Sequence, residues 1–175
     1  MKKNTYLRRH QQEIYNFSKK HKNMLCTATC GAGKTRVEFS IMSDFLKKES
    51  GVVVFIAPRH ILIEQQLDEF LEHAKKNEGN VFKGLFDKKG NRNFNIMEVS
   101  SRHSNDVDVS TTKIDDIIKN IKAAKKTNRS MLITVCNKSV PRLYEACEVL
   151  DFNFDAVIAD EAHYNTNEVK ENHNA

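Results

Sequence analysis

The sequence predicts an α/β fold in which a doubly wound, mostly parallel β-sheet is flanked by helices. Short apolar runs alternate along the chain with longer segments of helical period, and strands that are apolar on both faces are typical of a parallel sheet covered by helices. A glycine-rich turn also joins the first apolar run to the first helical segment. The 175 residues are enough for one domain with its own core, so we expect a single domain over residues 1–175.

The expected strands share β-branched or apolar residues, and each ends in turn-forming or polar residues. They are MLCTA (24–28), VVVFIA (52–57), MLITVC (131–136) and AVIAD (156–160), with NIMEV (95–99) as a weaker fifth.

Three segments between these strands have one apolar face at helical spacing. The first follows the glycine-rich turn, the second begins at His60, and the third covers residues 113–126, where Thr111 or Thr112 is the expected N-cap. Residues 76–108 are instead rich in Asn, Gly and charge, which predicts a surface excursion of loops around one short strand.

Composition and charge limit the classes of protein. The chain is 39% hydrophobic and 29% charged, and no apolar run approaches the roughly 20 residues that cross a membrane, so no membrane partner is expected. The four cysteines form no CxxC pair. This argues against a zinc site and favours reduced thiols. The expected location is therefore the cytoplasm, or the nucleus or a viral factory if the chain comes from a eukaryotic virus. The net charge of +5 fits a polyanionic partner, although many solvated surfaces have the same excess.

The glycine-rich turn has the residues of a phosphate-binding loop. Gly31 and Gly33 let the backbone turn so that successive N–H groups point at phosphate oxygens, and the N-terminus of the following helix adds partial positive charge. Lys34 is expected to reach the β- and γ-phosphates of ATP, and Thr35 to join the Mg²⁺ shell. The strict pattern has Gly where this chain has Ala28, and an unliganded turn is the alternative interpretation. The expected nucleotide-binding residues here are Thr29, Cys30, Gly31, Ala32, Gly33, Lys34, Thr35 and Arg36.

The second motif is DAVIADEAH (155–163), in which an apolar strand is followed by Asp160 and Glu161. Sheets of this class bind ligands at the C-terminal ends of their strands. Asp160 is therefore expected to hold Mg²⁺ through water, and Glu161 to polarise the attacking water as a general base. Taken alone, the acidic pair also fits an N-terminal helix cap, but its combination with an upstream phosphate loop favours the catalytic interpretation.

These motifs together resemble the first RecA-like domain of the superfamily 2 helicases and translocases of DEAH-box type. ATCGAGKT (28–35) resembles that family's motif I, in which Ala is normal at the first place, DEAH (160–163) is motif II, and APRHILIEQ (57–65) resembles motif Ia. The resemblance covers nearly all of residues 7–164. It implies a RecA-like P-loop NTPase fold that binds ATP and Mg²⁺ and hydrolyses ATP.

The resemblance also assigns roles to single residues. LRRHQ (7–11) resembles the family's Q motif, so Gln11 is the expected adenine-binding residue, with Gln12 or a plain helix start as alternatives. His163 is expected to link hydrolysis to nucleic-acid movement, with a polar residue that begins a loop as the alternative.

Contacts to the nucleic-acid backbone are implied for Arg59, Thr134 and Lys138, although Arg59 and Lys138 also fit solvated surface residues. The stretch VSTTKIDDI (109–117) looks like restriction-enzyme motors and phage or viral helicases. This favours DNA over RNA as the partner.

Motif III and the second RecA-like domain of the family do not occur in the 175 residues. We therefore expect a fragment, a truncated form or half of a split motor, which acts with a second RecA-like domain in cis or in trans. Because phosphoryl transfer needs an arginine from that domain, the chain alone is expected to bind ATP–Mg²⁺ without unwinding or translocating. One alternative is a catalytically inactive interaction or regulatory protein. Another is a small-molecule kinase, whose arginine-bearing lid has no counterpart in the sequence.

Overall fold

The computed structural model describes residues 6–27, 31–102 and 104–161. Within them, five strands form one parallel sheet in the order β3-β2-β4-β1-β5. The strands are β1 (Val52–Ala57), β2 (Phe94–Val99), β3 (Val109–Ser110), β4 (Ser130–Cys136) and β5 (Ala156–Ala159). The predicted α/β fold with a mostly parallel sheet is therefore confirmed.

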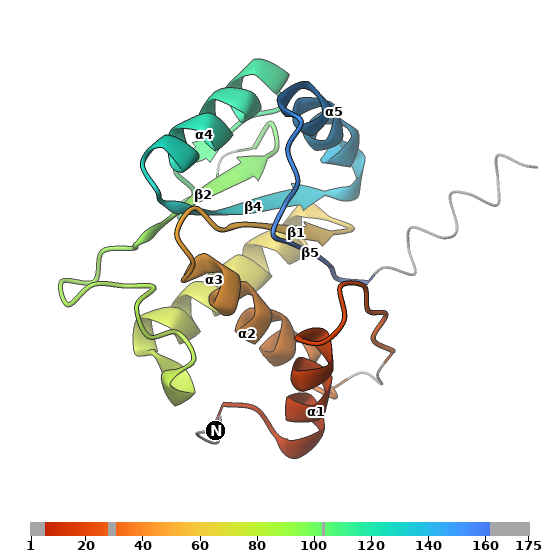
Figure 1. Cartoon of the computed structure of the whole chain (residues 1–175), viewed down its shortest axis with the longest axis vertical. Helices are drawn as coiled ribbons and strands as arrows, with labels where there is room; N and C mark the ends of the chain where they lie inside the picture. The colour runs from red at the N-terminus through yellow and green to blue at the C-terminus, as the bar shows by residue number, and fades with distance from the viewer. Residues whose placement is uncertain (1–5, 28–30, 103, 162–175) are drawn as a thin grey trace, which may run out of the picture.

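Helices cover both faces of this sheet. They are α1 (Arg9–Ser18), α2 (Lys34–Leu46), α3 (His60–Lys76), α4 (Ile114–Lys126) and α5 (Val140–Leu150), with short 3-10 helices η1 (Glu78–Asn80) and η2 (Asn137–Ser139). In Figure 1, α4 and α5 lie on one face, α2 and α3 lie on the other, and α1 packs against α2. Each described helix is too short or too polar to span a lipid bilayer.

The alternation of side chains along the strands divides the core into two layers. In β1, Val53 and Phe55 belong to the cluster beneath α2 and α3, whereas Val52 and Val54 belong to the cluster beneath α4 and α5. Successive side chains of a strand point to opposite faces. A strand that is covered on both faces is therefore expected to be mostly apolar, which is the pattern of VVVFIA.

The first apolar run, MLCTA, is not in a strand over its described residues 24–27, and Ala28 lies outside the described chain. Leu25 is 81% exposed, and the segment has no ladder partner among the described residues. The prediction of a strand here is therefore wrong for this structure. An extended segment needs a paired neighbour to satisfy its backbone N–H and C=O groups, and apolar composition does not supply one.

The polar segment 76–108 is anchored more firmly than its composition indicates. It contains the expected short strand, β2, but Phe82 and Leu85 are each only 1% exposed. The ring of Phe82 packs edge-on against Tyr6 and Phe70. The segment is thus part of the core, and its Asn, Gly and charged residues describe only its outer surface.

Two helical features differ from the sequence prediction. The segment of α5 was not among the expected helices, although Leu143 and Ala146 bury one of its faces. The N-cap of α4 is Lys113 rather than a threonine. Thr111 Oγ1 instead accepts a hydrogen bond from the Lys113 N–H at 3.1 Å, so the threonine organises the turn before the helix.

β5 forms an edge of the sheet. Among the described residues it pairs with β1 alone, and Val157 in its middle is 55% exposed.

Replacing Phe70 by Ala is expected to lower the free energy of unfolding by about 3–5 kcal/mol, since it removes a fully buried aromatic ring. Phe70 is 0% exposed and packs edge-on against Phe39, Phe82 and Phe94. Urea unfolding followed by circular dichroism measures the loss. Ile61→Ala in the same helix is the control, because Ile61 is 53% exposed and its truncation is expected to change stability by about 0.5 kcal/mol or less. Equal losses in the two variants would contradict this account of the core.

Candidate nucleotide-binding site

The phosphate-loop segment and the acidic pair lie close together at the C-terminal ends of the strands. Lys34 is the first residue of α2, and Asp160 follows the last residue of β5. α2 packs against β5, and the charges of Lys34, Asp160 and Glu161 all act on the carboxyl group of Glu38 in α2. The fold therefore brings together the two motifs that the sequence places at opposite ends of the chain.

Both glycines of the loop have left-handed backbone. Gly31 has φ of +79° and Gly33 has φ of +75°, a region that residues with a Cβ rarely adopt. At Gly33 a second constraint applies, because a Cβ atom there would lie 2.2 Å from the Nε2 atom of Gln11. Glycine satisfies both constraints at the residue that precedes α2, whereas a larger residue there would have to displace the end of the Gln11 side chain.

Gln11 in α1 holds this loop through its side-chain amide. Its Nε2 donates to the carbonyl oxygens of Ala32 and Gly33, each at 3.1 Å. Its Oε1 accepts a hydrogen bond from the Arg8 N–H at 2.8 Å, which also caps the start of α1. His10 Nε2 lies 3.1 Å from the same Ala32 oxygen. Gln11 is 2% exposed, so α1 and the loop are joined by a buried amide.

The structure distinguishes the two glutamines that the sequence offered for adenine binding. Gln12 bonds to Asn16 within its own helix, whereas Gln11 faces the loop. Both ends of the Gln11 amide are engaged by backbone groups, so binding adenine requires it to exchange part of these hydrogen bonds. The role of Gln11 in adenine binding stays a prediction.

Lys34 and Thr35 are half-buried at the start of α2. Arg36, which the sequence also placed at the nucleotide, has a different partner here. Its Nη1 donates to the Tyr6 carbonyl oxygen at 3.0 Å, and its guanidinium lies over the Tyr6 ring at 4.8 Å. The structure thus links Arg36 to the segment before α1.

The chain turns sharply after β5. The Asp160 N–H donates to the Ile56 carbonyl oxygen at 2.9 Å, and Asp160 Oδ1 accepts from the Glu161 N–H at 2.9 Å. Glu161 has φ of +53°, which is uncommon for a residue with a side chain and is often found at functional sites. Both carboxylates are half-buried at this turn.

Glu38 is a residue of this site that sequence reasoning missed. Its pKa is raised from the ordinary 4.5 to about 7, mainly by burial and also by the negative charges of Asp160 and Glu161, while the positive charge of Lys34 opposes the rise. Its Oε2 atom is buried and makes no hydrogen bond in the described structure. The signal in the sequence was its position four residues after Lys34, which places both side chains on one face of a helix.

Arg59 and Lys138 lie at neighbouring strand ends. Arg59 comes directly before α3 and Lys138 lies in η2, and both are exposed. The strands that precede them, β1 and β4, pair in parallel through Ala57 and Cys136. Two exposed, positively charged side chains therefore lie at the C-terminal ends of the strands, as the acidic pair does.

Thr134 does not join them. It is 1% exposed, and its Oγ1 makes no hydrogen bond within the described residues. It lines a small pocket of about 10 Å³ together with Phe39 and Leu132. Because β4 is covered on both faces, the Thr134 side chain is buried in this structure, and its expected contact with nucleic acid stays a prediction.

A buried acid–base cluster that the sequence did not reveal supports the start of α3. Glu98 in β2 is 1% exposed, and its Oε1 lies 2.5 Å from His60 Nε2. Ser104 Oγ donates to Glu98 Oε2 at 2.8 Å. Because His60 follows Arg59, this contact joins the start of α3 to β2 beside the exposed arginine.

Three predicted site residues, Thr29, Cys30 and His163, lie outside the described residues. Within the described ranges, no three His, Cys, Asp or Glu side chains are grouped closely enough to hold a metal ion by themselves.

Comparison with known proteins shows the family to which the chain belongs. The family model described as "Type III restriction enzyme, res subunit" matches residues 4–174. No curated protein matches the chain significantly. A solved structure of a nuclease-deletion mutant of the Type ISP restriction-modification enzyme LlaGI, in complex with a DNA substrate mimic, is similar in fold, with a TM-score of 0.67 and 21% identity. The match covers 90% of this chain and 15% of that chain, so the sequence spans only a small part of the length of that enzyme.

The contact between Gly33 and Gln11 predicts that Gly33→Ala is more harmful than a glycine substitution with the same backbone angle elsewhere. The control is Gly90→Ala, since Gly90 has φ of +83° and no atom lies within 4 Å of the position that a Cβ would take there. Both variants bear left-handed strain of about 1–2 kcal/mol. Gly33→Ala also displaces Gln11 from two hydrogen bonds, worth about 1–3 kcal/mol together. Urea unfolding measures the difference, and equal losses would show that the contact has no energetic weight.

The raised pKa of Glu38 predicts a specific dependence of stability on pH. Between about pH 4.5 and 7, the folded state keeps a proton on Glu38 that the unfolded state has lost, so this group makes stability fall as pH rises through that window and leaves it constant above. The Glu38→Gln variant lacks this contribution. Its stability relative to wild type should therefore increase from pH 4.5 to 7, by on the order of 1–3 kcal/mol, as measured by denaturant unfolding. A difference that is independent of pH would contradict the assignment.

Proposed function

Because the chain belongs to the family of the Type III restriction enzyme res subunit, we propose that it is the ATP-binding lobe of an ATP-dependent helicase or translocase that acts on nucleic acid. The observation that carries this proposal is the meeting of the α2 N-terminus with the acidic pair after β5. A helix N-terminus preceded by a left-handed glycine loop is suited to phosphate, and carboxylates beside it are suited to a divalent cation.

In this proposal the loop backbone and Lys34 bind the phosphates of ATP, with Thr29, Cys30, Ala32 and Thr35 beside them. Successive N–H groups point at phosphate oxygens, and Lys34 pairs with the β- and γ-phosphates. Gln11 contacts the adenine base by exchanging hydrogen bonds that it makes to the loop. Since those bonds reach the carbonyl groups of Ala32 and Gly33, base binding and loop position are mechanically linked.

The residues fit Mg²⁺. An orphaned buried carboxylate oxygen on Glu38 lies in the field of two further carboxylates and one ammonium group, which leaves an excess of negative charge for a cation to balance. Thr35 and Asp160 are the residues that would hold the ion, the latter through water. When bound, Mg²⁺ neutralises charge that develops on the phosphates. Glu161 orients and polarises the attacking water, and His163 links hydrolysis to nucleic-acid movement.

The nucleic-acid partner is proposed to be DNA. Arg59 and Lys138 lie at adjacent strand ends with exposed side chains, a placement that suits two contacts along one phosphate backbone. The LlaGI structure that resembles this chain was solved with a DNA substrate mimic, which favours DNA over RNA.

A second RecA-like domain, in cis or in trans, completes the motor in this proposal. The site as described contains one ammonium group against three carboxylates, and the transition state of phosphoryl transfer needs additional positive charge. We propose that an arginine from the second domain supplies it, so that hydrolysis and movement require both domains.

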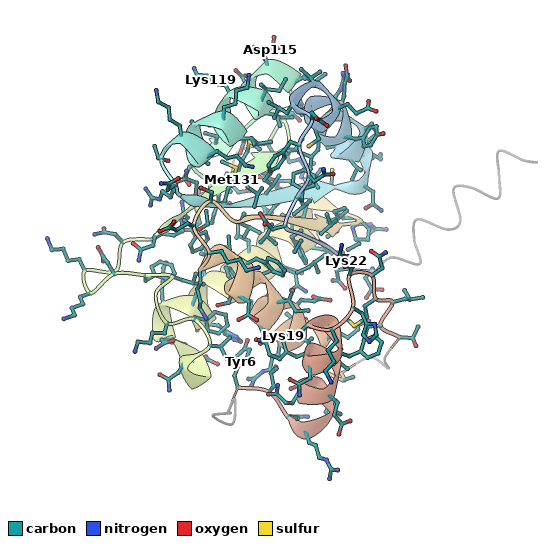
Figure 2. All side chains as sticks on the ribbon, viewed as in Figure 1. Tyr6, Lys19, Lys22, Asp115, Lys119 and Met131 are labelled. Carbon is teal, nitrogen blue, oxygen red and sulfur yellow. The ribbon has the colours of Figure 1, made fainter. Side chains whose placement is uncertain are left out.

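Lys34→Ala is expected to weaken binding of an ATP analogue in the presence of Mg²⁺ by about 10- to 100-fold, because it removes a charge-assisted hydrogen bond to phosphate. Equilibrium titration with a fluorescent nucleotide measures the change. The matched control is Lys119→Ala, which removes the same charge from the exposed face of α4. In Figure 2, Lys119 lies at the opposite end of the molecule from Tyr6, the residue that contacts Arg36 in α2.

Wild-type affinity in the control and loss in Lys34→Ala would support the proposed site. If both variants bound nucleotide as tightly as wild type, the proposal that Lys34 binds the phosphates would be wrong. If the wild-type chain bound nucleic acid but no nucleotide, the alternative of a catalytically inactive binding or regulatory protein would be preferred.

A further inference from the structure

Glu38 occupies an unusual place for an acidic residue. It lies on α2 four residues after Lys34, so both side chains project from the same face of the helix beside the phosphate loop. Its Oε2 atom is buried and has no hydrogen-bond partner in the part of the chain that the structure describes. A buried carboxylate oxygen without a partner is costly, so the arrangement calls for a ligand that provides a donor or a positive charge.

The surroundings of Glu38 indicate which kind of ligand this is. The charged groups that act on it are Lys34, which favours its ionised form, and Asp160 and Glu161, which oppose it. When all are ionised, three carboxylates face one ammonium group. The excess of two negative charges equals the charge of one divalent cation.

The described side chains do not form a cage that would bind such an ion alone, since no three acidic, His or Cys side chains are grouped closely enough. This fits Mg²⁺, which usually keeps several of its waters and is bound by substrate phosphates with one or two carboxylates. A third carboxylate near such a site acts through water.

We propose that Glu38 is an additional positioning residue of the Mg²⁺–nucleotide site, where its carboxylate accepts hydrogen bonds from water molecules of the ion's shell. The proposal rests on the proposed nucleotide-binding function and extends it to a residue outside the two motifs. Glu38 does not contact the nucleotide in this role. It raises the affinity for the ion, and therefore contributes to nucleotide binding only when the ion is present.

The test compares Glu38→Gln with wild type in the binding of a fluorescent ADP analogue, once with Mg²⁺ titrated and once in excess chelator. Glutamine keeps the size of the side chain and removes its charge. The Mg²⁺ concentration at half-maximal binding is expected to rise about 10-fold, as is typical for loss of an outer-shell partner. Affinity in chelator is expected to stay within about 2-fold, or to improve slightly, because a repulsive charge has been removed.

Glu49→Gln is the matched control. It makes the same change of charge at an exposed residue just beyond the C-terminal end of α2, and it is expected to behave as wild type in both titrations. Glu38→Asp is a second variant that retains the carboxylate, and it should recover part of the Mg²⁺ dependence. Direct counting of bound Mn²⁺ by electron paramagnetic resonance, in the presence of ADP, provides a readout that does not depend on hydrolysis.

Each outcome decides a separate point. An equal loss of nucleotide affinity with and without Mg²⁺ would show that Glu38 acts on Lys34 or on the fold, and would overturn the proposal. So would a Glu38→Gln titration identical to that of wild type. If wild type itself bound no nucleotide under any condition, the proposed function would fail together with this inference, and that result is distinguishable from the other two.

Discussion

The parallel pairing of β1 with β4 on one side and β5 on the other is the constraint on which the site depends. Parallel strands end at the same edge, and the residues that follow β1, β4 and β5 are Arg59, Lys138 and Asp160, each within a few positions of the strand end. Register fixes this alignment to one residue, because Ala57 lies opposite Cys136 and Ile56 lies opposite Ala159. A shift of one residue would turn the side chains of a strand to the opposite face, so the two-layered core that fixes the register also fixes the site.

A second, smaller constraint links the first helix to the phosphate loop. Gln11 is the third residue of α1 and bonds both to the backbone before that helix and to the carbonyl groups before α2. The buried amide of Gln11 thereby makes hydrogen bonds at the N-terminal ends of both α1 and α2. The close approach of Gln11 to Gly33 explains why the loop needs glycine at that residue for a reason beyond its backbone angle.

Much of the fold could be predicted from the sequence, because β1 and β4 are buried on both faces and consist mainly of apolar and β-branched residues. The same argument should have predicted that Thr134, inside β4, is buried. The prediction of a strand at MLCTA was wrong because a strand needs a neighbouring strand to pair with, and the local sequence does not show whether one is present. Glu38 was missed for a similar reason: its environment is determined by which face of α2 lies against the end of β5. Candidate site residues that belong to a sequence motif could be predicted from the sequence, whereas residues whose position depends on the packing of distant segments could not.

Within the described residues β5 is an edge strand, and this has a consequence for how the candidate site is completed. A strand with one described neighbour presents backbone N–H and C=O groups on its other side, to which a further extended segment would pair. Such an addition would occur one strand spacing, about 5 Å, from the residues that precede Asp160. The polypeptide that covers this edge would therefore set the direction in which the acidic pair leaves the sheet. Covering of this strand and completion of the candidate site would then be the same event.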